Sequence, residues 1–346
     1  ASMAGSTQGY DIAYSIDIGP SGNAFIAGYF QFTAYFGTGS ITTSGGSDVF
    51  IAKISPQGDW VWTGVAGGAS SSEAYAIAID SQGGVFVAGE FYTGISFGNI
   101  TYSTGGYSNS FIAKAIDRGN SVDWDWAVTV DSSSGNSAED IAFDPNGDLV
   151  VTGNFQGTAS FGNTAMTSSG NQDVYVAKIL SNGNSAWAQK AGSGSNDAGL
   201  GIGMDSQGNL YVTGYFFQNT ISFGSVDIAT SGGFDAFIAK MSLDYDQDAI
   251  PDSLDDDDDG DFILDAFDGC NPSPFGFQSL ASTDHDRDGC RDSDEDEDDG
   301  TRSMLFSVLK PSDSLSAVVT GLSPFTNYSL YVRVRSRAAL ASFSVP

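Results

Sequence analysis

Residues 1–242 contain four copies of one sequence pattern, at a period of about 61 to 64 residues. Each copy carries a turn glycine before an apolar segment, a glycine inside that segment, a Phe-Gly pair, and a lysine that ends an Asp/Asn-x-aromatic-x-Ala-Lys segment. These anchors are Gly22, Gly83, Gly147 and Gly208; Gly28, Gly89, Gly153 and Gly214; Phe36, Phe97, Phe161 and Phe223; and Lys53, Lys114, Lys178 and Lys240. Four anchors that stay in register over four copies indicate a repeat architecture, in which each copy is one structural unit that packs against its neighbours.

Each copy is predicted to contribute four short β-strands. In the second copy, apolar and polar residues alternate over 74–80, 85–91, 109–116 and 122–130, with glycine turns between these segments. Alternation with a period of two is typical of half-buried strands, and the 44 glycines favour tight turns over helices. Four short antiparallel strands make one blade of a β-propeller. The chain is therefore predicted to be all-β, with a small four-bladed propeller over residues 1–242.

The fourth copy contains the stretch Asp205-Ser-Gln-Gly-Asn-Leu-Tyr-Val-Thr-Gly214. This stretch resembles the core of the SBBP-type β-propeller repeats of bacterial and archaeal secreted proteins. The resemblance covers residues 1–242, and it implies a propeller fold and a surface location without implying a chemistry.

The fourth copy differs from the others in its last segment. The first three copies end in a segment that contains tryptophan, whereas the fourth continues from Lys240 into an acidic stretch. The N-terminal Ala1-Ser-Met-Ala-Gly-Ser6 aligns with Ala188-Gln-Lys-Ala-Gly-Ser193, the second half of such a segment. We therefore predict that the N-terminal strand completes the last blade and closes the ring, because closure removes unpaired strand edges. A neighbouring molecule is the alternative donor. The tryptophans are Trp60, Trp62, Trp124, Trp126 and Trp187.

Residues 243–300 form an acidic neck that is predicted to bind calcium. The neck holds 22 of the chain's 43 acidic residues against two arginines. Three twelve-residue windows carry acids at positions 1, 3, 5, 9 and 12. This spacing wraps oxygen ligands around one ion, with the carbonyl at position 7 and a bidentate last acid, so about three calcium ions are expected. The ligands are Asp244, Asp246, Asp248, Ile250, Asp252 and Asp255; Asp257, Asp259, Asp261, Ile263, Asp265 and Asp268; and Asp284, Asp286, Asp288, Cys290, Asp292 and Glu295.

The calcium loops differ from EF-hands in two respects. Position 6 holds Ala249, Phe262 and Gly289, where the EF-hand has an invariant glycine, and no flanking segment shows helical periodicity. The tandem Asp-x-Asp-x-Asp pattern with an intervening cysteine pair instead resembles thrombospondin type 3 repeats, which implies a rod or collar organised around bound calcium. The other interpretation is a disordered acidic linker, and this is the state expected without calcium, because like charges at this density repel.

The two cysteines, Cys270 and Cys290, stand at either end of one acidic loop. This placement favours a disulfide, which requires an oxidising compartment. The bond would close a loop of about 20 residues and stabilise by roughly 3 kcal/mol in the chain-entropy model. The N-terminus lacks the basic and apolar regions of a signal peptide, so we interpret the chain as an already processed extracellular or cell-surface protein.

Residues 301–346 are predicted to form part of a β-sandwich. The stretch 320–335 resembles the region of fibronectin type III domains that enters the second-last strand, with Tyr328 at the tyrosine-corner position. A complete domain needs about 100 residues, and only 46 residues follow the neck. Either the rest of the sandwich lies elsewhere, or a strand from another subunit completes it.

Charge and hydropathy argue against two classes of partner. A formal net charge of −30 with 13 basic residues disfavours nucleic acid, which is bound by clustered Lys and Arg. No run of about 18 apolar residues occurs, so no membrane span is expected. The expected partners are calcium ions and other copies of this chain, with surface glycans or proteins as the alternative.

Residues suited to catalysis are sparse, and we predict that the chain is not an enzyme. The single histidine, His285, occupies position 2 of the third calcium loop, so neither a Ser-His-Asp triad nor an ordinary zinc site is expected. A glycosidase needs two paired carboxylates, and nothing in the sequence marks a pair among the acids of the repeats. These acids are Glu73, Glu90, Asp123, Asp125, Glu139 and Asp140. Asn99 and Asn327 begin Asn-x-Ser/Thr sequons and are candidate glycosylation sites.

These features predict an extracellular, calcium-stabilised structural subunit that assembles into a surface filament by strand exchange. The alternative is an adhesin-like module whose propeller binds a glycan or a protein, and a glycan-active enzyme is a third class. A structural role predicts strand-mediated contacts between chains, whereas a binding module predicts exposed aromatic side chains at the propeller mouth.

Overall fold

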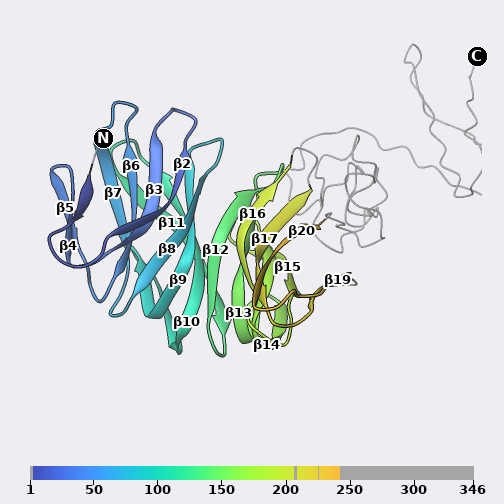
Figure 1. Cartoon of the computed structure of the whole chain (residues 1–346). Coiled ribbons are helices and arrows are strands. Elements are labelled where there is room, and N and C mark those ends of the chain that lie inside the picture. The colour runs from blue at the N-terminus through green and yellow to red at the C-terminus, as the bar shows by residue number, and fades with distance from the viewer. Residues whose placement is uncertain (1–2, 206–208, 225, 242–346) are drawn as a thin grey trace, which may run out of the picture.

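The computed structural model describes residues 3–205, 209–224 and 226–241, and all regular structure in these ranges is β-strand (Figure 1). The all-β prediction is therefore confirmed for the described residues. The predicted calcium ligands, the cysteine pair, Asn327 and the fibronectin-like stretch lie outside these ranges. Within the same ranges, no helix has the length and apolarity that a membrane span needs.

Each sequence repeat forms one antiparallel set of strands, called first to fourth in chain order, and each set is called the sheet of its repeat. A short pairing of residues 131–132 with residues 159–160 joins the sets of repeats 2 and 3 into one eight-stranded sheet. Repeats 1 to 3 have four strands each, and among the described residues repeat 4 has three. The strands are β2 (Ile12–Ile18), β3 (Ala24–Phe30), β6 (Asp48–Ile54) and β7 (Trp60–Ala66) in repeat 1; β8 (Ser72–Ile79), β9 (Gly84–Phe97), β10 (Ile100–Asp117) and β11 (Val122–Ser132) in repeat 2; β12 (Asn136–Phe143), β13 (Leu149–Phe161), β14 (Thr164–Ile179) and β15 (Ser185–Ala191) in repeat 3; and β16 (Ala198–Met204), β17 (Leu210–Phe217) and β20 (Phe234–Met241) in repeat 4.

A hairpin connects the second and third strands of each repeat. In repeats 2 and 3 the hairpin is a continuation of the two strands themselves. In repeats 1 and 4 it is separate, formed by β4 (Thr33–Phe36) with β5 (Gly39–Thr42) and by β18 (Ile221–Phe223) with β19 (Val226–Ile228).

The strand glycine of each repeat lies opposite a β-bulge in the first strand. The register shifts in the first strand occur beside Tyr14, Tyr75, Glu139 and Leu200. A Cβ on the facing glycine would stand 1.9 to 2.0 Å from a backbone carbonyl oxygen of the bulged strand in all four repeats. The bulge thus brings two backbones together so closely that only glycine fits, which is the physical reason for this anchor. The four glycines are Gly28, Gly89, Gly153 and Gly214.

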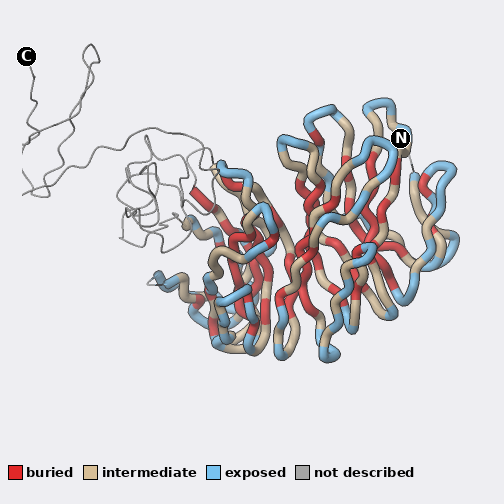
Figure 2. Tube along the Cα trace, turned by 180° about the vertical axis from the view of Figure 1, so that it is seen from behind, coloured by how far each residue is buried: buried red, intermediate tan, exposed pale blue. Residues whose placement is uncertain are grey.

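The hydrophobic core lies between consecutive sheets. One cluster joins repeats 1 and 2 and includes Ile51, Val87 and Phe97, a second joins repeats 2 and 3, and a third joins repeats 3 and 4. Buried residues therefore follow the strands, and exposed residues gather in the loops (Figure 2). Because no single sheet can bury both of its faces alone, each repeat depends on its neighbours for stability.

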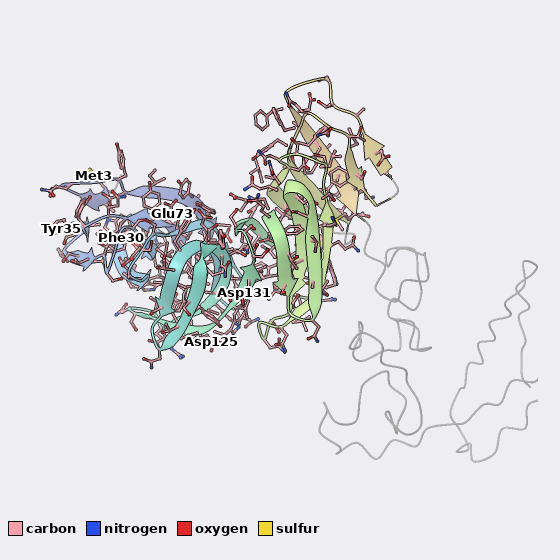
Figure 3. The ribbon with its side chains drawn as sticks, turned by 90° about the horizontal axis from the view of Figure 1, so that it is seen from below. Met3, Phe30, Tyr35, Glu73, Asp125 and Asp131 are labelled. Atoms are coloured by element: carbon pink, nitrogen blue, oxygen red, sulfur yellow. The ribbon has the colours of Figure 1, made fainter. Side chains whose placement is uncertain are left out.

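The four sheets stand side by side in an open arc, in chain order (Figure 3). The first strands contact one another in sequence, β2 with β8, β8 with β12 and β12 with β16. Among the described residues, no sheet connects repeat 4 back to repeat 1.

The N-terminal strand β1 (Ala4–Ser6) pairs with β4 of the first repeat. The predicted pairing with the last sheet is therefore wrong for the structure described here. Figure 1 places the N-terminus and β20 at opposite ends of the arc, and β1 lies beside the β4–β5 hairpin of repeat 1.

Candidate functional site: the open fourth repeat

The third strand of repeat 4, β20, ends the arc. In repeats 1 to 3 the equivalent strand pairs on its outer side with a fourth strand. Among the described residues, β20 pairs with β17 alone. The sequence continues from Met241 into the acidic neck, and no tryptophan follows Trp187. The point at which the fourth copy departs from the sequence pattern is thus also the point at which the described structure has a strand edge.

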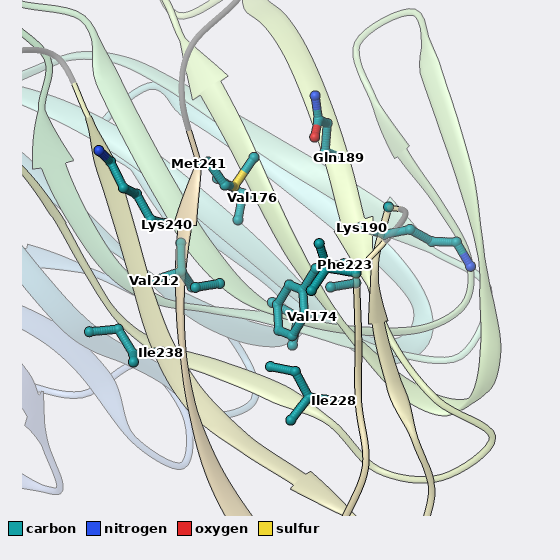
Figure 4. A pocket seen from close by; sticks show the side chains of 14 residues that line it. Val174, Val176, Gln189, Lys190, Val212, Phe223, Ile228, Ile238, Lys240 and Met241 are labelled. Atoms are coloured by element: carbon teal, nitrogen blue, oxygen red, sulfur yellow. The ribbon is translucent and has the colours of Figure 1, made fainter. Parts of the chain in front are cut away.

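A cavity of 320 Å³ lies beside this edge (Figure 4). Its walls come from β14 and β15 of repeat 3, and from β17, β20 and the β18–β19 hairpin of repeat 4. The lining is mainly apolar and includes Val176, Val212, Phe223 and Ile228. Sequence reasoning did not predict this cavity, because its walls come from segments up to 67 residues apart that meet only in the folded chain.

The other repeats show what occupies the corresponding place. The glycine of the Phe-Gly pair lies beside a tryptophan near the start of the fourth strand: a Cβ on Gly37 would lie 3.1 Å from Trp60, and one on Gly98 would lie 3.8 Å from Trp124. The phenylalanines beside these glycines pack edge-on against the same tryptophans, with ring centroids 5.0 and 4.9 Å apart. In repeat 4, the equivalent Gly224 has nothing within 4 Å of its Cβ position. The cavity is therefore the place where repeats 1 and 2 hold a fourth-strand aromatic residue.

The two ends of the arc expose side chains that are buried at equivalent positions in the interior. Ile238 on β20 is 72% exposed, whereas its counterparts in repeats 1 and 2, Ile51 and Ile112, are fully buried. At the other end, Ile16 on β2 is 64% exposed, and its counterpart Ile77 is 6% exposed. Each end is thus one half of an inter-repeat contact. Isolated exposed apolar residues are common on proteins, but a repeated contact surface that lacks its partner indicates an interaction site.

A second cluster of interest surrounds the bulges of the first strands. The Tyr75 hydroxyl donates hydrogen bonds to Glu90, at 2.9 Å, and to Glu73, at 3.4 Å. Asn154 donates to Glu139, at 3.3 Å. Burial raises the pKa of all three glutamates, and at Glu90 the charges of Glu139 and Glu73 raise it further. The structure therefore brings together three acids that the sequence did not mark as partners.

The other predicted acids do not join this cluster. Asp123 forms an exposed ion pair with Arg118 at 3.1 Å, and Asp125 is exposed on the same strand. Asp140 accepts a hydrogen bond from the Ile202 amide at 2.9 Å, which ties repeat 3 to repeat 4. In the part of the chain that the structure describes, no group of three or more His, Cys, Asp or Glu residues is arranged to hold a metal ion.

Replacing Glu90 with glutamine is expected to stabilise the protein at pH 8. The pKa of Glu90 in the folded state is above its ordinary value of 4.5, chiefly because of burial, so the charged form opposes folding. The increase in the free energy of unfolding should be complete above the folded-state pKa of Glu90. It should vanish below about pH 4, where Glu90 is protonated in both the folded and the unfolded state. Urea unfolding of the variant and of an Asp125→Asn control across this pH range measures it. A constant difference at every pH would contradict a titrating carboxyl.

The repeat lysines lie against aromatic rings or in buried ion pairs, and the described sequon lies in an exposed turn. The amino groups of Lys53, Lys114 and Lys240 lie 5.8, 5.0 and 5.9 Å from the ring centroids of aromatic residues on the neighbouring strand. Lys178 forms a buried ion pair with Asp144 at 2.9 Å, and Lys53 forms an ion pair with Asp117 at 2.6 Å. Asn99 is exposed in the turn between β9 and β10, so its side chain is accessible to modification.

No family model matches the chain. It is 28% identical over 217 residues to the regulatory protein FlaEY of Caulobacter vibrioides, which covers 58% of this chain and 22% of FlaEY. It is 22% identical over 299 residues to an uncharacterized WD repeat-containing protein of Acanthamoeba polyphaga mimivirus, which covers 68% of this chain and 21% of that protein. The chain thus spans about a fifth of the length of each relative. A protein of unknown function from Dyadobacter fermentans has a crystal structure that matches 65% of this chain and 59% of its own, with a TM-score of 0.34 and 11% identity.

Proposed function

We propose that this chain is an extracellular, calcium-stabilised structural subunit that assembles with other copies of itself by strand exchange. The four sheets are interpreted as blades of a small propeller-type arc. The observation that carries the proposal is the outer edge of β20, which has no partner strand among the described residues, with its adjoining apolar cavity. An unpaired edge beside a cavity is a template for an added strand. No catalytic role is proposed.

Calcium has a mechanical role in this proposal. Bound ions, about three in number, would offset only part of the charge of the 22 acids of residues 243–300 but would hold this segment in one conformation, with the Cys270–Cys290 disulfide as a covalent brace. Because the segment directly follows β20 in the sequence, its order would determine how the open edge is presented to another chain.

Removal of calcium is expected to abolish regular assembly. Chelation leaves the acids of the neck uncompensated, and their mutual repulsion extends the segment. Negative-stain electron microscopy of the purified chain should show ordered fibres in calcium, and frayed or dispersed particles in excess chelator. A magnesium-containing sample at equal ionic strength controls for charge screening. Isolated particles in calcium as well as in chelator would overturn the structural function.

Binding of a carbohydrate is the second candidate function, and one arrangement favours it. The bulge residue Tyr14 is half-exposed and packs edge-on against Tyr75 at 5.2 Å, beside the glutamate cluster. Exposed aromatic faces next to hydrogen-bonding carboxyls suit a sugar ring. Retention of the chain on immobilised polysaccharides, lost in a Tyr14→Ala variant, would support this function.

A further inference from the structure

We propose that the strand that completes repeat 4 is β1 of a second copy of this chain. The inference rests on the proposed assembly function and identifies its donor, its register and its direction. Three observations carry it: β1 has the position of a fourth strand, its glycine matches the open edge, and the two ends of the arc are complementary.

The pairing of β1 repeats the contact that every fourth strand makes with the next repeat. Gly67 at the end of the fourth strand of repeat 1 bridges to Ser96 in the next hairpin, and Gly192 after β15 bridges to Ser222. In β1, Gly5 pairs with Tyr35, which like Ser96 and Ser222 directly precedes the Phe-Gly pair of its hairpin. β1 therefore has the place of a fourth strand belonging to a sheet that precedes repeat 1.

The link from β1 into repeat 1 also matches the link from repeat 3 into repeat 4. The Ser6 amide and hydroxyl donate to the Asp11 carboxylate at 2.5 and 2.7 Å. At the corresponding junction, the Ser193 amide and hydroxyl donate to Asp197 at 2.5 and 3.0 Å. The aspartate stands five residues after Ser6 and four after Ser193, so the two junctions share their donors and their acceptor group but not their loop length. This likeness supports a fourth-strand role for β1.

Gly5 corresponds to the glycine that, in other repeats, lies against the first residue of the third-strand motif. In repeats 1 and 3, the glycine after the fourth strand covers the aspartate that begins the third-strand motif. A Cβ on Gly67 or Gly192 would lie 2.1 or 2.2 Å from the carboxylate carbon of Asp48 or Asp173. The equivalent Asp235 in repeat 4 accepts the Ser231 amide at 2.7 Å, as Asp48 accepts that of Ser44, but it is not covered.

The register follows from this glycine. In repeat 3, Val174 pairs with Ala191 and Tyr175 pairs with Lys190, immediately before Gly192. Transferred to repeat 4, this register places Gly5 over Asp235, Ala4 opposite Ala236 and Met3 opposite Phe237. Phe237 belongs to the core between repeats 3 and 4, whereas Met3 is 89% exposed in the single chain. Strand donation would thus place Met3 on the side of β20 that faces the cavity.

The ends of the arc determine the direction of association. The face with Ile238 and the face with Ile16 are opposite halves of the same inter-repeat contact, so repeat 1 of one copy can stack on repeat 4 of another as repeat 2 stacks on repeat 1. The two faces differ, and the interface is therefore head-to-tail, which generates a ring or an open polymer. The separation of β1 and β20 in Figure 1 favours a second copy over the same chain as the donor.

Cysteine cross-linking tests this register. Residues directly opposite in an antiparallel pair have Cα atoms about 4.5 to 5.5 Å apart, within the range of a disulfide. An Ala4→Cys chain and an Ala236→Cys chain are mixed in calcium and oxidised. We expect a disulfide-linked dimer at least tenfold above the yield of an Ala4→Cys and Ser103→Cys mixture, with the unsubstituted chain as the background for Cys270 and Cys290. The double variant should give a ladder of multimers.

A Gly5→Val substitution in the Ala4→Cys chain provides the second test. The added side chain would meet the Asp235 carboxylate, so the dimer yield should fall at least tenfold. Gly106→Val is the matched control for backbone strain, since Gly106 also has a positive φ, of 108°, and nothing lies within 4 Å of its Cβ position. Circular dichroism of both chains should match that of the parent.

The outcomes distinguish an error in the identity of the donor strand from an error in the proposed structural function. Calcium-dependent fibres without the Ala4–Ala236 cross-link would overturn β1 as the donor and leave the structural function in place. A cross-linked monomer of the double variant would show that the chain closes on itself, which overturns the second copy as donor. Particles without fibres and without cross-links would overturn both proposals.

Discussion

Replacing Gly153 with alanine is expected to lower the free energy of unfolding by about 3 kcal/mol or more, the upper part of the range for overpacking a core. The added Cβ would stand 2.0 Å from the Ser137 carbonyl oxygen and 2.9 Å from the Tyr175 ring. Neither neighbour can move freely, because Ser137 lies in a bulged strand that pairs with β13, and Tyr175 is fully buried. Urea unfolding followed by tryptophan fluorescence measures the loss.

Gly105→Ala is the control for Gly153→Ala. Gly105 is exposed in the irregular stretch of β10 between Ser103 and Ser108, with nothing within 4 Å of its Cβ position, so this change should leave the unfolding midpoint within the error of the parent. Because repeat proteins can unfold in more than one step, the transition should be compared over its whole range. Equal stability of the two variants would show that the bulge does not bring the two backbones together at Gly153.

Replacing Lys178 with methionine is expected to cost about 3 to 5 kcal/mol, the usual effect of leaving one member of a buried ion pair uncompensated. The Lys178 amino group lies 2.9 Å from Asp144 and 3.2 Å from Asp148, and the Lys178 and Asp144 side chains are 3% and 2% exposed. Methionine retains most of the apolar stem, so the measured loss reports the charge. Burial by itself lowers the pKa of Lys178, but its hydrogen bond and charge interaction with Asp144 outweigh burial and raise it.

The exposed Arg118–Asp123 pair is the internal comparison for Lys178. Both of its side chains are more than half exposed, and surface pairs of this kind contribute about 0 to 1 kcal/mol. Arg118→Met should therefore change the unfolding midpoint little, and 0.5 M salt should remove what difference there is. A Lys178→Met variant as mild as Arg118→Met would contradict the contribution assigned to the buried pair.

Much of the fold could be predicted from the spacing of the anchors. The strand glycines, the Phe-Gly pairs and the Asp/Asn-x-aromatic-x-Ala-Lys segments all lie where a four-stranded repeat requires them, and Phe36, Phe97 and Phe161 are buried between or beside sheets. The alignment of the N-terminus with the second half of a fourth strand was also informative. It predicted a strand at the N-terminus, which the structure has as Ala4–Ser6, but not the strand with which it pairs.

The glutamate cluster shows why the candidate sites were harder to predict. Glu73, Glu90 and Glu139 come from the first and second strands of two repeats, at positions that hold other residues in the remaining copies. Their proximity depends on how adjacent sheets are placed around the bulges, which is a relation between repeats. The calcium ligands are different, because their spacing within twelve residues is itself the predicted geometry; they lie outside the described residues and remain a prediction.

The sequence by itself determined what recurs locally: strands of alternating polarity, a glycine wherever two backbones touch, and four units of equal design. These properties depend on a few residues that are neighbours in the chain, and they can therefore be predicted from the sequence alone. Only the tertiary structure decided that the four sheets form an open arc, that β1 pairs with β4, and that Ile16 and Ile238 are left exposed at its two ends. Every repeat has nearly the same two faces, so its local sequence cannot show whether a face contacts another repeat or is exposed. That difference depends on the position of the repeat in the stack, which only the folded chain defines.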